Sequence, residues 1–360
     1  MKLRKSGEQG PHAYFYAMYN YLNVKILLLV CLSMLNAETM DAQELIELNS
    51  GTQAHLRGLS VVNDRVIWAS GTGGQVGRST DGGQSWSWRT IPGFESVDFR
   101  DVEAFDELTA VVMGVGSPGY ILRTTNGGKD WTIVYKNEDK RIFLDALYFW
   151  NDRSGMVIGD PIDGRFVVLR SFDGGRSWKS VPTDRRPPAQ EGEACFAASG
   201  SNIAGIARDE AVFVSGGTQS RFFHRNNPVK LPMVQGLETT GANAIAAYRS
   251  NTKKKAKNLI IVGGDFMHDG SDSANCALSR DGGKSWFAPN RSPFGYRSGV
   301  SWIDSNRAIA CGTSGVDISS DRGVNWQAIS KTGFHTCTKA NSGQSVFLAG
   351  AKGRIALLKW

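Results

Sequence analysis

Short apolar segments alternate with glycine-containing turns through most of the chain. One set of segments recurs: a polar start, an apolar strand, a turn, a second apolar strand that ends in Gly, a loop, and a third strand. Residues 100–131 show the whole set, RDVEAFDELTAVVMGVGSPGYILRTTNGGKDW. Runs of this length, bounded by turn residues, are typical of strands in all-β folds. Glycine supplies 42 of the 360 residues, above the usual share of roughly 7%, which fits a chain with many turns.

The third strand of most sets leads into one repeated turn, S/T-x-D-G-G-x-S/T-W, which we call the box. It reads STDGGQSW at 79–86, TTNGGKDW at 124–131, SFDGGRSW at 171–178, SRDGGKSW at 279–286 and SSDRGVNW at 319–326. Glycine adopts positive φ without steric cost, Asp can accept hydrogen bonds from turn amides, and Trp offers a large apolar surface. The box therefore predicts a hairpin turn with a scaffold role rather than a catalytic one. The residues with this structural role are Asp81, Trp86, Asn126, Trp131, Asp173, Trp178, Asp281, Trp286, Asp321 and Trp326.

The spacing of the boxes predicts seven units. Successive box tryptophans are separated by 45, 47, 108 and 40 residues, so one decayed unit lies in the longest gap, around 193–235. After the last box the chain supplies three strands, and residues 43–49 read as a lone strand before the first unit. Closing a ring with that N-terminal strand gives an all-β, seven-bladed β-propeller of four-stranded antiparallel blades, formed by residues 43–360 as a single domain. The units begin near Arg57, Arg100, Leu144, Glu193, Asn243, Arg297 and His335.

Two resemblances follow from these residues. The box resembles the Asp-box, the repeat of bacterial neuraminidases and of many other propellers. Over residues 50–360 the chain is similar, more narrowly, to the photosystem II assembly and stability factor-like propellers, in the unit 100–131 and in GYRSGVSW, GTSGVDISSDRGVNW and GAKGRIALL. That resemblance implies a seven-bladed, non-enzymatic assembly or binding platform, and it leaves the partner open.

Residues 1–42 read as an N-terminal extension with a secretory signal. From Met18, an alternative start, a weakly basic segment leads into the apolar run Ile26–Leu35 and then a polar tail. Ten apolar residues are too few to span a bilayer but suit the apolar part of a signal peptide. Cleavage is expected after Ala37 or Ala42. We therefore predict an exported protein, periplasmic or secreted, with no later membrane span.

Composition and cysteine spacing exclude several classes of function. The net charge of +7 is spread along the chain, without the basic stripe with interleaved aromatics that indicates nucleic-acid binding. The histidines are scattered and no cysteine pair has metal-ligand spacing, so we expect neither a metal nor a cofactor. The four cysteines after the signal lie in apolar contexts, which predicts buried thiols, with a disulfide as the alternative in an oxidising compartment. They are Cys195, Cys276, Cys311 and Cys337.

Polar residues at the starts of the inner strands predict a binding site. In a propeller these starts meet around the central channel, together with the loops after each second strand. The second residue of every inner strand is polar, namely Arg57, Arg100, Asp145, Glu193, Asn243, Arg297 and His335. Tyr296 and the loop carboxylates Asp160 and Asp265 are expected on the same face. Because arginine binds carboxylates through paired hydrogen bonds, we predict that a monomer binds a protein segment or a carbohydrate there.

A glycoside hydrolase, sialidase-like or other, is the alternative. Such enzymes place two carboxylates on either side of the scissile bond, and Glu193 with Asp160 or Asp265 would be the candidates. The seven units and the adjacency of Tyr296 to Arg297 depart from the neuraminidase pattern. Paired carboxylates about 5–9 Å apart on the channel face would favour a glycosidase. Arginines without such a pair would favour a docking surface.

Overall fold

Antiparallel strands make up the regular structure of the protein. The computed structural model describes residues 43–249 and 254–360, so the predicted secretory signal lies outside the described residues. No helix in these two ranges is long and apolar enough to cross a membrane. The only helical turns described are two short 3-10 segments, η1 (Thr183–Arg185) and η2 (Ala351–Gly353).

Five sheets of the described chain contain four antiparallel strands each. The first is β2 (Leu56–Val61), β3 (Ile67–Gly71), β4 (Gln75–Ser79) and β5 (Ser87–Thr90). The second is β6 (Phe99–Ala104), β7 (Ala110–Gly114), β8 (Gly119–Thr124) and β9 (Thr132–Asn137). The third is β10 (Leu144–Phe149), β11 (Gly155–Ile162), β12 (Arg165–Ser171) and β13 (Lys179–Ser180). The sixth unit along the chain is β22 (Gly299–Trp302), β23 (Ala308–Gly312), β24 (Gly315–Ser319) and β25 (Gln327–Ser330).

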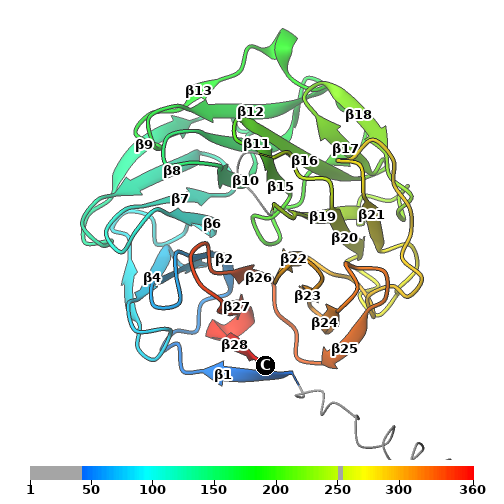
Figure 1. Cartoon of the computed structure of the whole chain (residues 1–360). Helices are drawn as coiled ribbons and strands as arrows, with labels where there is room; N and C mark the ends of the chain where they lie inside the picture. Colours follow the sequence, from blue (N-terminus) through cyan, green and yellow to red (C-terminus); the bar gives the residue numbers. More distant parts are fainter. Residues whose placement is uncertain (1–42, 250–253) are drawn as a thin grey trace, which may run out of the picture. The chain divides into compact units, whose positions relative to one another are not determined.

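The N-terminal strand completes the last sheet. Its order is β1-β28-β27-β26, so the first strand of the propeller lies on the outside of strands from the C-terminal end (Figure 1). Leu48 pairs with Ile355 and Ile46 with Leu357. This is the ring closure that the lone strand in the sequence predicted. The strands are β1 (Glu44–Leu48), β26 (Thr336–Lys339), β27 (Val346–Ala349) and β28 (Ile355–Lys359).

The fourth and fifth units are fused into one eight-stranded sheet. They join through a single residue pair, Gly216 with Gly241. A Cβ on Gly241 would lie 2.5 Å from the Cα of Gly216, so the fusion depends on glycine. The fourth strand of the fifth unit is reduced to a bridge between Leu278 and Phe287. The strands are β14 (Glu193–Ala194), β15 (Ile203–Ala207), β16 (Glu210–Gly217), β17 (Arg221–His224), β18 (Asn227–Lys230), β19 (Thr240–Ala247), β20 (Leu259–Asp265) and β21 (Cys276–Ser279).

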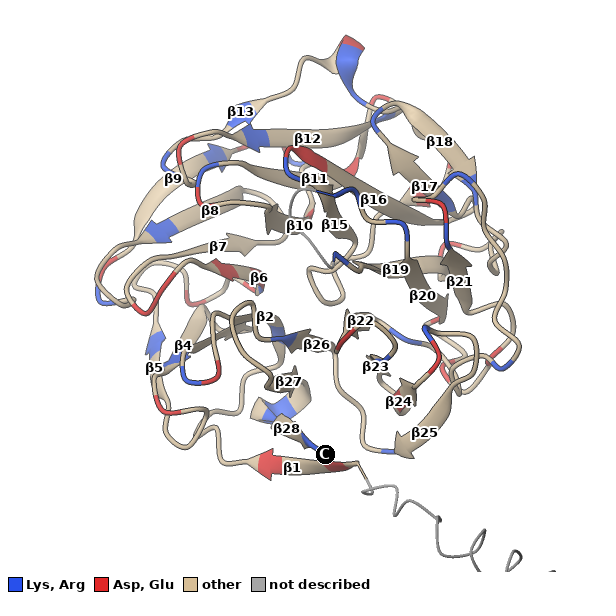
Figure 2. Cartoon of the chain, in the orientation of Figure 1, with Lys and Arg blue, Asp and Glu red and all other residues tan. Residues whose placement is uncertain are grey.

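The sheets are arranged around a common axis, with their first strands innermost (Figure 1). Five separate sheets and two fused units are compatible with the predicted seven blades. Many charged positions lie in the turns between strands (Figure 2), and the inner strands carry charged residues as well, among them Arg57, Arg100 and Asp145. The all-β propeller predicted from the repeats is therefore confirmed.

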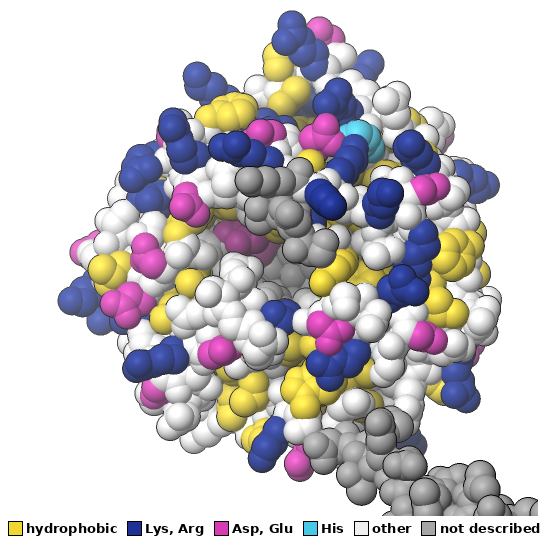
Figure 3. Space-filling model, in the orientation of Figure 1, with side chains coloured by type: hydrophobic (Ala, Val, Ile, Leu, Met, Phe, Trp, Pro, Cys, Tyr) yellow, Lys and Arg dark blue, Asp and Glu magenta, His cyan; other side chains and the backbone are white. Residues whose placement is uncertain are grey.

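The surface around the axis carries charges of both signs. On the face shown in Figure 3, Lys and Arg side chains are spread around the outer part of the ring, and Asp and Glu side chains lie among them. Hydrophobic side chains show between these charged groups as small separate patches. The positive charge of this face is therefore distributed around the blades rather than gathered on one of them.

Each box forms the turn after the third strand of its blade. In the first box, Ser79 Oγ donates to Asp81 Oδ1 at 2.8 Å and accepts from the amide of Gly83 at 2.8 Å. Asp81 also accepts from the amide of Ser85 at 2.9 Å. These hydrogen bonds, with that from the Ser85 hydroxyl the largest contribution, lower the pKa of Asp81 to about 2. The aspartate of the box is thus used within its own turn.

The tryptophan of each box packs into the groove between its own blade and the preceding one. Trp178 of the third blade joins Val111 and Ile121 of the second, and Trp326 of the sixth joins Ile260 of the fifth. Both indoles are almost fully buried. The apolar core therefore lies between the blades, and the box tryptophans are part of it. The four described cysteines are also buried and unpaired, as predicted.

Candidate functional site

A loop of the fourth unit occupies the axial channel. The inner strand of this unit is split, because β14 and β15 both pair with β16 while residues 195–202 between them leave the sheet. We call residues 195–202 the plug; it lies at the centre of the ring in Figure 1. The guanidinium of Arg57 donates to the carbonyl of Ala198 at 3.1 Å. On another side of the axis, Ser199 Oγ donates to the carbonyl of Ser298 at 2.6 Å.

The plug approaches the second blade closely at a glycine. Gly200 has φ +69°, and a Cβ on it would overlap the carboxylate of Asp101. Asp101 is buried and accepts hydrogen bonds from the amides of Val102 and Leu147. Burial raises the pKa of this carboxyl group well above its ordinary value. The sequence analysis missed the plug, because ASGSN at 198–202 reads as an ordinary polar turn.

Six of the predicted ligand-binding residues line one cavity of about 450 Å³ on the side of the plug where the inner strands begin. We call it the arginine-face cavity. The residues from the predicted set are Arg57, Arg100, Asp160, Asn243, Tyr296 and His335. Apolar walls come from Phe196 of the plug and from Phe266, whose rings meet edge to face with centroids 5.7 Å apart. The cavity thus combines cationic, uncharged polar and aromatic surface.

The two arginines supply positive charge that the cavity only partly neutralises. Arg100 Nε pairs with Asp98 Oδ2 at 2.7 Å, and its Nη1 donates to the carbonyl of Ala197 at 3.4 Å. Burial, followed by repulsion from Arg100, lowers the pKa of Arg57, yet a guanidinium stays charged at neutral pH. Because each guanidinium carries several N–H donors, both can also bind an incoming anion.

Three further polar side chains of the cavity, those of His335, Tyr296 and Asn243, are neutral. Burial, together with the charge of Arg57, lowers the pKa of His335 to about 4. Its Nδ1 lies 2.9 Å from the carbonyl of Leu56, which assigns the proton of the neutral ring to Nδ1. Tyr296 Oη donates to Asn243 Oδ1 at 2.8 Å, and burial raises the phenol pKa. These groups offer hydrogen bonds without adding charge.

Asp160 is the only carboxylate among the described residues that line the arginine-face cavity. Its Oδ1 accepts from the amide of Cys195 at 3.0 Å, and burial raises its pKa to about 6. Asp145 lies fully buried and outside the lining. Burial and the neighbouring charge of Asp160 raise the pKa of Asp145 well above its ordinary value. Asp145 is therefore buried behind the cavity and is not available for contact with a ligand.

Three predicted residues lie elsewhere. Arg297 is buried, and its Nε pairs with Asp317 Oδ2 of β24 at 2.5 Å. Glu193 is buried against Arg221, whose Nε donates to it at 2.8 Å. Both are ion pairs inside the blades, where they satisfy buried charge.

Asp265 also lies outside the cavity lining, where His268 Nδ1 is 2.7 Å from its Oδ2. Neither Glu193 nor Asp265 lines the cavity with Asp160, so the carboxylates suggested for a glycosidase do not share its described surface. That lining combines two arginines with a single carboxylate, the arrangement that favours docking.

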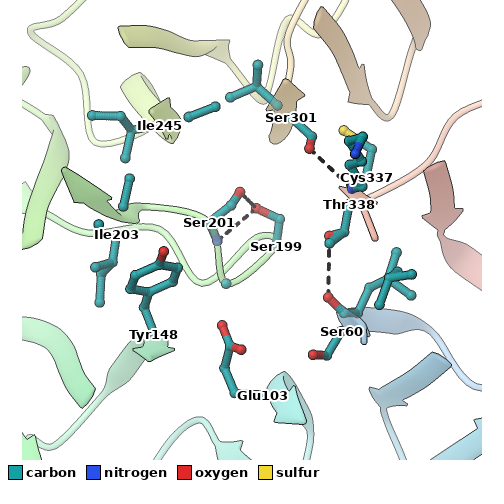
Figure 4. A pocket seen from close by; sticks show the side chains of 18 of the residues that line it. Ser60, Glu103, Tyr148, Ser199, Ser201, Ile203, Ile245, Ser301, Cys337 and Thr338 are labelled. Atoms are coloured by element: carbon teal, nitrogen blue, oxygen red, sulfur yellow. Dashed lines mark hydrogen bonds between the residues drawn. The ribbon is translucent and has the colours of Figure 1, made fainter. Parts of the chain in front are cut away.

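A second cavity, of about 320 Å³, lies on the other side of the plug, at the ends of the inner strands. Figure 4 shows Glu103 and Tyr148 facing hydroxyl groups of the plug, Ser199 and Ser201. Burial, with the nearby Asp101, raises the pKa of Glu103 well above its ordinary value. The sequence contained one indication of this second cavity: Asp101 and Glu103 are two residues apart on β6, so their side chains lie on the same face of the strand.

Comparisons with known proteins support the fold and one resemblance. No family model matches the chain. The chain is 23% identical over 265 residues to the photosystem II assembly lipoprotein Ycf48 of Synechococcus sp. (strain CC9902), a match covering 65% of this chain and 75% of that protein. This confirms the similarity to photosystem II assembly-factor propellers predicted from the sequence.

Solved structures give the same fold. A structure described as YCF48 bound to D1 peptide matches with a TM-score of 0.60 and 19% identity, over 89% of this chain and 98% of that one. YCF48 from Cyanidioschyzon merolae matches with a TM-score of 0.57 and 17% identity, over 88% and 98%. The WD40 β-propeller domain of Doa1 matches with 0.57 and 12% identity, over 89% and 98%. At these identities the likeness establishes the propeller architecture.

Proposed function

We propose that the protein is an exported, non-catalytic binding platform that holds an acidic protein segment in the arginine-face cavity. The observation that carries the proposal is the convergence of Arg57 and Arg100 on one cavity whose described lining contains a single carboxylate, Asp160. We include export in the proposal because the apolar run 26–35 suits a signal peptide.

The chemistry of the cavity fits a carboxylate with an apolar neighbour. The two guanidinium groups bind a carboxylate through charge-assisted hydrogen bonds. Phe196 and Phe266 offer an aromatic wall for the adjacent side chain, and the Tyr296–Asn243 pair offers neutral polar contacts. Because the plug holds the floor of the cavity in place, little ordering is needed on binding, which favours affinity.

The comparisons support a protein segment as the ligand. The relative Ycf48 is named as an assembly lipoprotein, and in one similar structure YCF48 is bound to a D1 peptide. A non-catalytic role is supported by the position of Glu193 and Asp265 outside the described lining that contains Asp160. Assembly by holding a segment of a partner is the function that the cavity supports best.

Binding of defined peptides tests the proposal. Peptides of equal length with acidic, neutral or basic side chains, each with a free or amidated C-terminus, are titrated into the protein by calorimetry. Acidic or free-carboxylate peptides should bind most tightly, and Arg100→Gln should weaken them about tenfold or more, which corresponds to one charged hydrogen bond. Glutamine can still donate to the plug, so the melting temperature should change little.

Arg297→Ala is the contrasting variant. It leaves Asp317 buried without its partner, so it should cost about 3–5 kcal/mol of stability while peptide affinity of the folded protein stays near that of the wild type. Equal affinity for acidic and basic peptides, or no effect of Arg100→Gln, would sink the proposed function.

A further inference from the structure

The groove between the third and fourth blades lacks a box tryptophan, and its apolar cluster contains Trp150, the residue after β10, instead. In the fourth blade Arg225 and Asn226 alone connect β17 to β18, where five other blades have a box. In those blades the second glycine of the box packs on a side chain of the preceding blade. Gly128 contacts Trp68, for example, and Gly175 contacts Val111.

Strand register identifies the matching position in the third blade. Trp68 pairs with Arg78, Val111 with Arg123, and Met156 with Arg170. Met156 is therefore the side chain on which a box of the fourth blade would rest. A cavity of about 230 Å³ lies there, lined by Met156 and Val168 of the third blade and by Ala211 and Phe213 of the fourth.

Arg170, which pairs with Met156, also lacks the backbone carbonyl partner that its counterparts in other blades have. Arg123 Nε donates to the carbonyl of Gly174, the first glycine of the next box, at 3.0 Å. Arg78, the arginine at this position in the first blade, donates from Nη1 to the carbonyl of Glu107 in the second blade. Arg170 lines the groove with its guanidinium 4.7 Å from the centroid of the Trp150 ring, and its Nε, like that of Arg78, is buried without a hydrogen-bond partner among the described residues. A buried donor without an acceptor is costly, so this position favours a ligand that supplies a carbonyl oxygen.

The rim of the groove is polar and charged. Glu210 accepts from Lys255 Nζ at 2.8 Å and lies 3.2 Å from His224 Nε2. Burial, with repulsion from Lys255, lowers the pKa of His224, so the ring is neutral at pH 7. An apolar cavity with a polar rim of this kind is typical of a site that binds one aromatic side chain of a partner.

We propose that this groove binds a turn of a partner protein that inserts a tryptophan side chain beside Met156 and offers a backbone carbonyl to Arg170. The two features match the two groups that the third box supplies to the groove between the second and third blades, the indole of Trp178 and the carbonyl of Gly174. The volume suffices, since an apolar cavity of about 150 Å³ accommodates benzene. The site lies on the outer wall between blades and is separate from the arginine-face cavity, so it is independent of the proposed function.

A peptide copied from the chain's own box tests this site. The probe is the blocked hexapeptide acetyl-DGGKSW-amide, the sequence of residues 281–286, and its control replaces the tryptophan with alanine. Binding to the full chain is followed by calorimetry. We expect a dissociation constant in the millimolar range or below for the probe and at least about tenfold weaker binding for the control.

Two variants locate the binding. Arg170→Met keeps the apolar stem but removes the donor, and should weaken the probe about tenfold. Ala211→Trp should fill the groove, abolish binding and leave the protein folded with an equal or higher melting temperature. Arg123→Met, which changes the equivalent arginine in a filled groove, is the matched control and should leave probe affinity unchanged.

The outcomes separate the possible occupants. Equal affinity for the probe and its alanine control, or unchanged binding in Arg170→Met and Ala211→Trp, would overturn the proposal. Free indole that binds as tightly as the hexapeptide would also overturn it, because the carbonyl would then contribute nothing. If Ala211→Trp fails to fold, the comparison of Arg170→Met with Arg123→Met still decides.

Discussion

The carboxyl group of Asp160 couples the arginine-face cavity to pH. Its pKa of about 6 in the folded chain lies above the ordinary value of about 3.9. Between these values the folded protein holds a proton that the unfolded chain releases, so this group adds stability as pH falls through 6. Protonation also removes the only negative charge among the described residues of the cavity lining, so an anionic ligand then meets Arg57 and the Asp98-paired Arg100 without repulsion from Asp160.

Acidic peptides should therefore bind severalfold more tightly at pH 5.5 than at pH 7.5, because their own carboxylates remain ionised in this range. The variant Asp160→Asn should bind with the tighter affinity at both pH values, so its affinity should no longer depend on pH in this range. The Asn side chain can still accept from the amide of Cys195. Calorimetric titrations at several pH values would check this, and identical slopes for wild type and variant would contradict it.

The sequence predicted the residues of the cavity better than their pairings. Aligning the inner strands placed Arg57, Arg100 and His335 correctly at one opening, because every blade repeats the same turn pattern. It could not place Arg297 or Glu193. Their ion partners, Asp317 and Arg221, come from third strands whose polar residues follow no repeat. A buried polar partner across the sheet, rather than strand position, decides whether such a side chain faces the channel.

Among the elements, the plug depends on one glycine. Alanine at position 200 would need positive φ and would also place its Cβ against the Asp101 carboxylate, closer than atomic radii allow. Gly164 has φ +73° and nothing within 4 Å of the position that a Cβ would take. Alanine at position 164 therefore measures the free-energy cost of positive φ without a steric clash. Gly200→Ala should therefore destabilise the protein by about 1–3 kcal/mol more than Gly164→Ala. Urea denaturation of both variants measures the difference, and equal losses would mean that the plug yields without strain.

The plug was beyond sequence analysis for a physical reason. Glu193 and Ala194 begin a regular inner strand, and residues 203–207 continue to pair with β16, so the two halves read as parts of one unit. What draws the intervening residues across the axis is a set of acceptors and donors on other blades, such as Arg57 and Ser298. Those contacts join residues far apart in the chain, and no local pattern encodes them.

At the scale of the whole molecule, β1 closes the ring. Removing residues 44–48 would expose the edge of β28 and the apolar side chains that Leu45, Ile46 and Leu48 cover. The deletion should cost roughly 3 kcal/mol or more of stability and promote self-association through the open edge. The control Glu44→Ala/Glu47→Ala keeps the strand pairing and should remain close to wild type. Thermal unfolding and light scattering would compare them, and a stable, monomeric deletion variant would contradict this role.

The repeats made the global architecture predictable, because box spacing fixes the number of units and the lone N-terminal strand fixes the closure. The irregular part was the fusion of the fourth and fifth units. It rests on the close approach of Gly216 to Gly241, and paired glycines at strand ends look like any other turn in a glycine-rich chain. Local deviations from a repeat are set by such long-range contacts.

The plug determines how ligands can occupy the two cavities along the axis. The plug contributes residues to both cavities and is hydrogen-bonded to other blades on two sides of the axis, so it lies between the two cavities. Two different ligands can therefore bind at opposite ends of the axis at the same time.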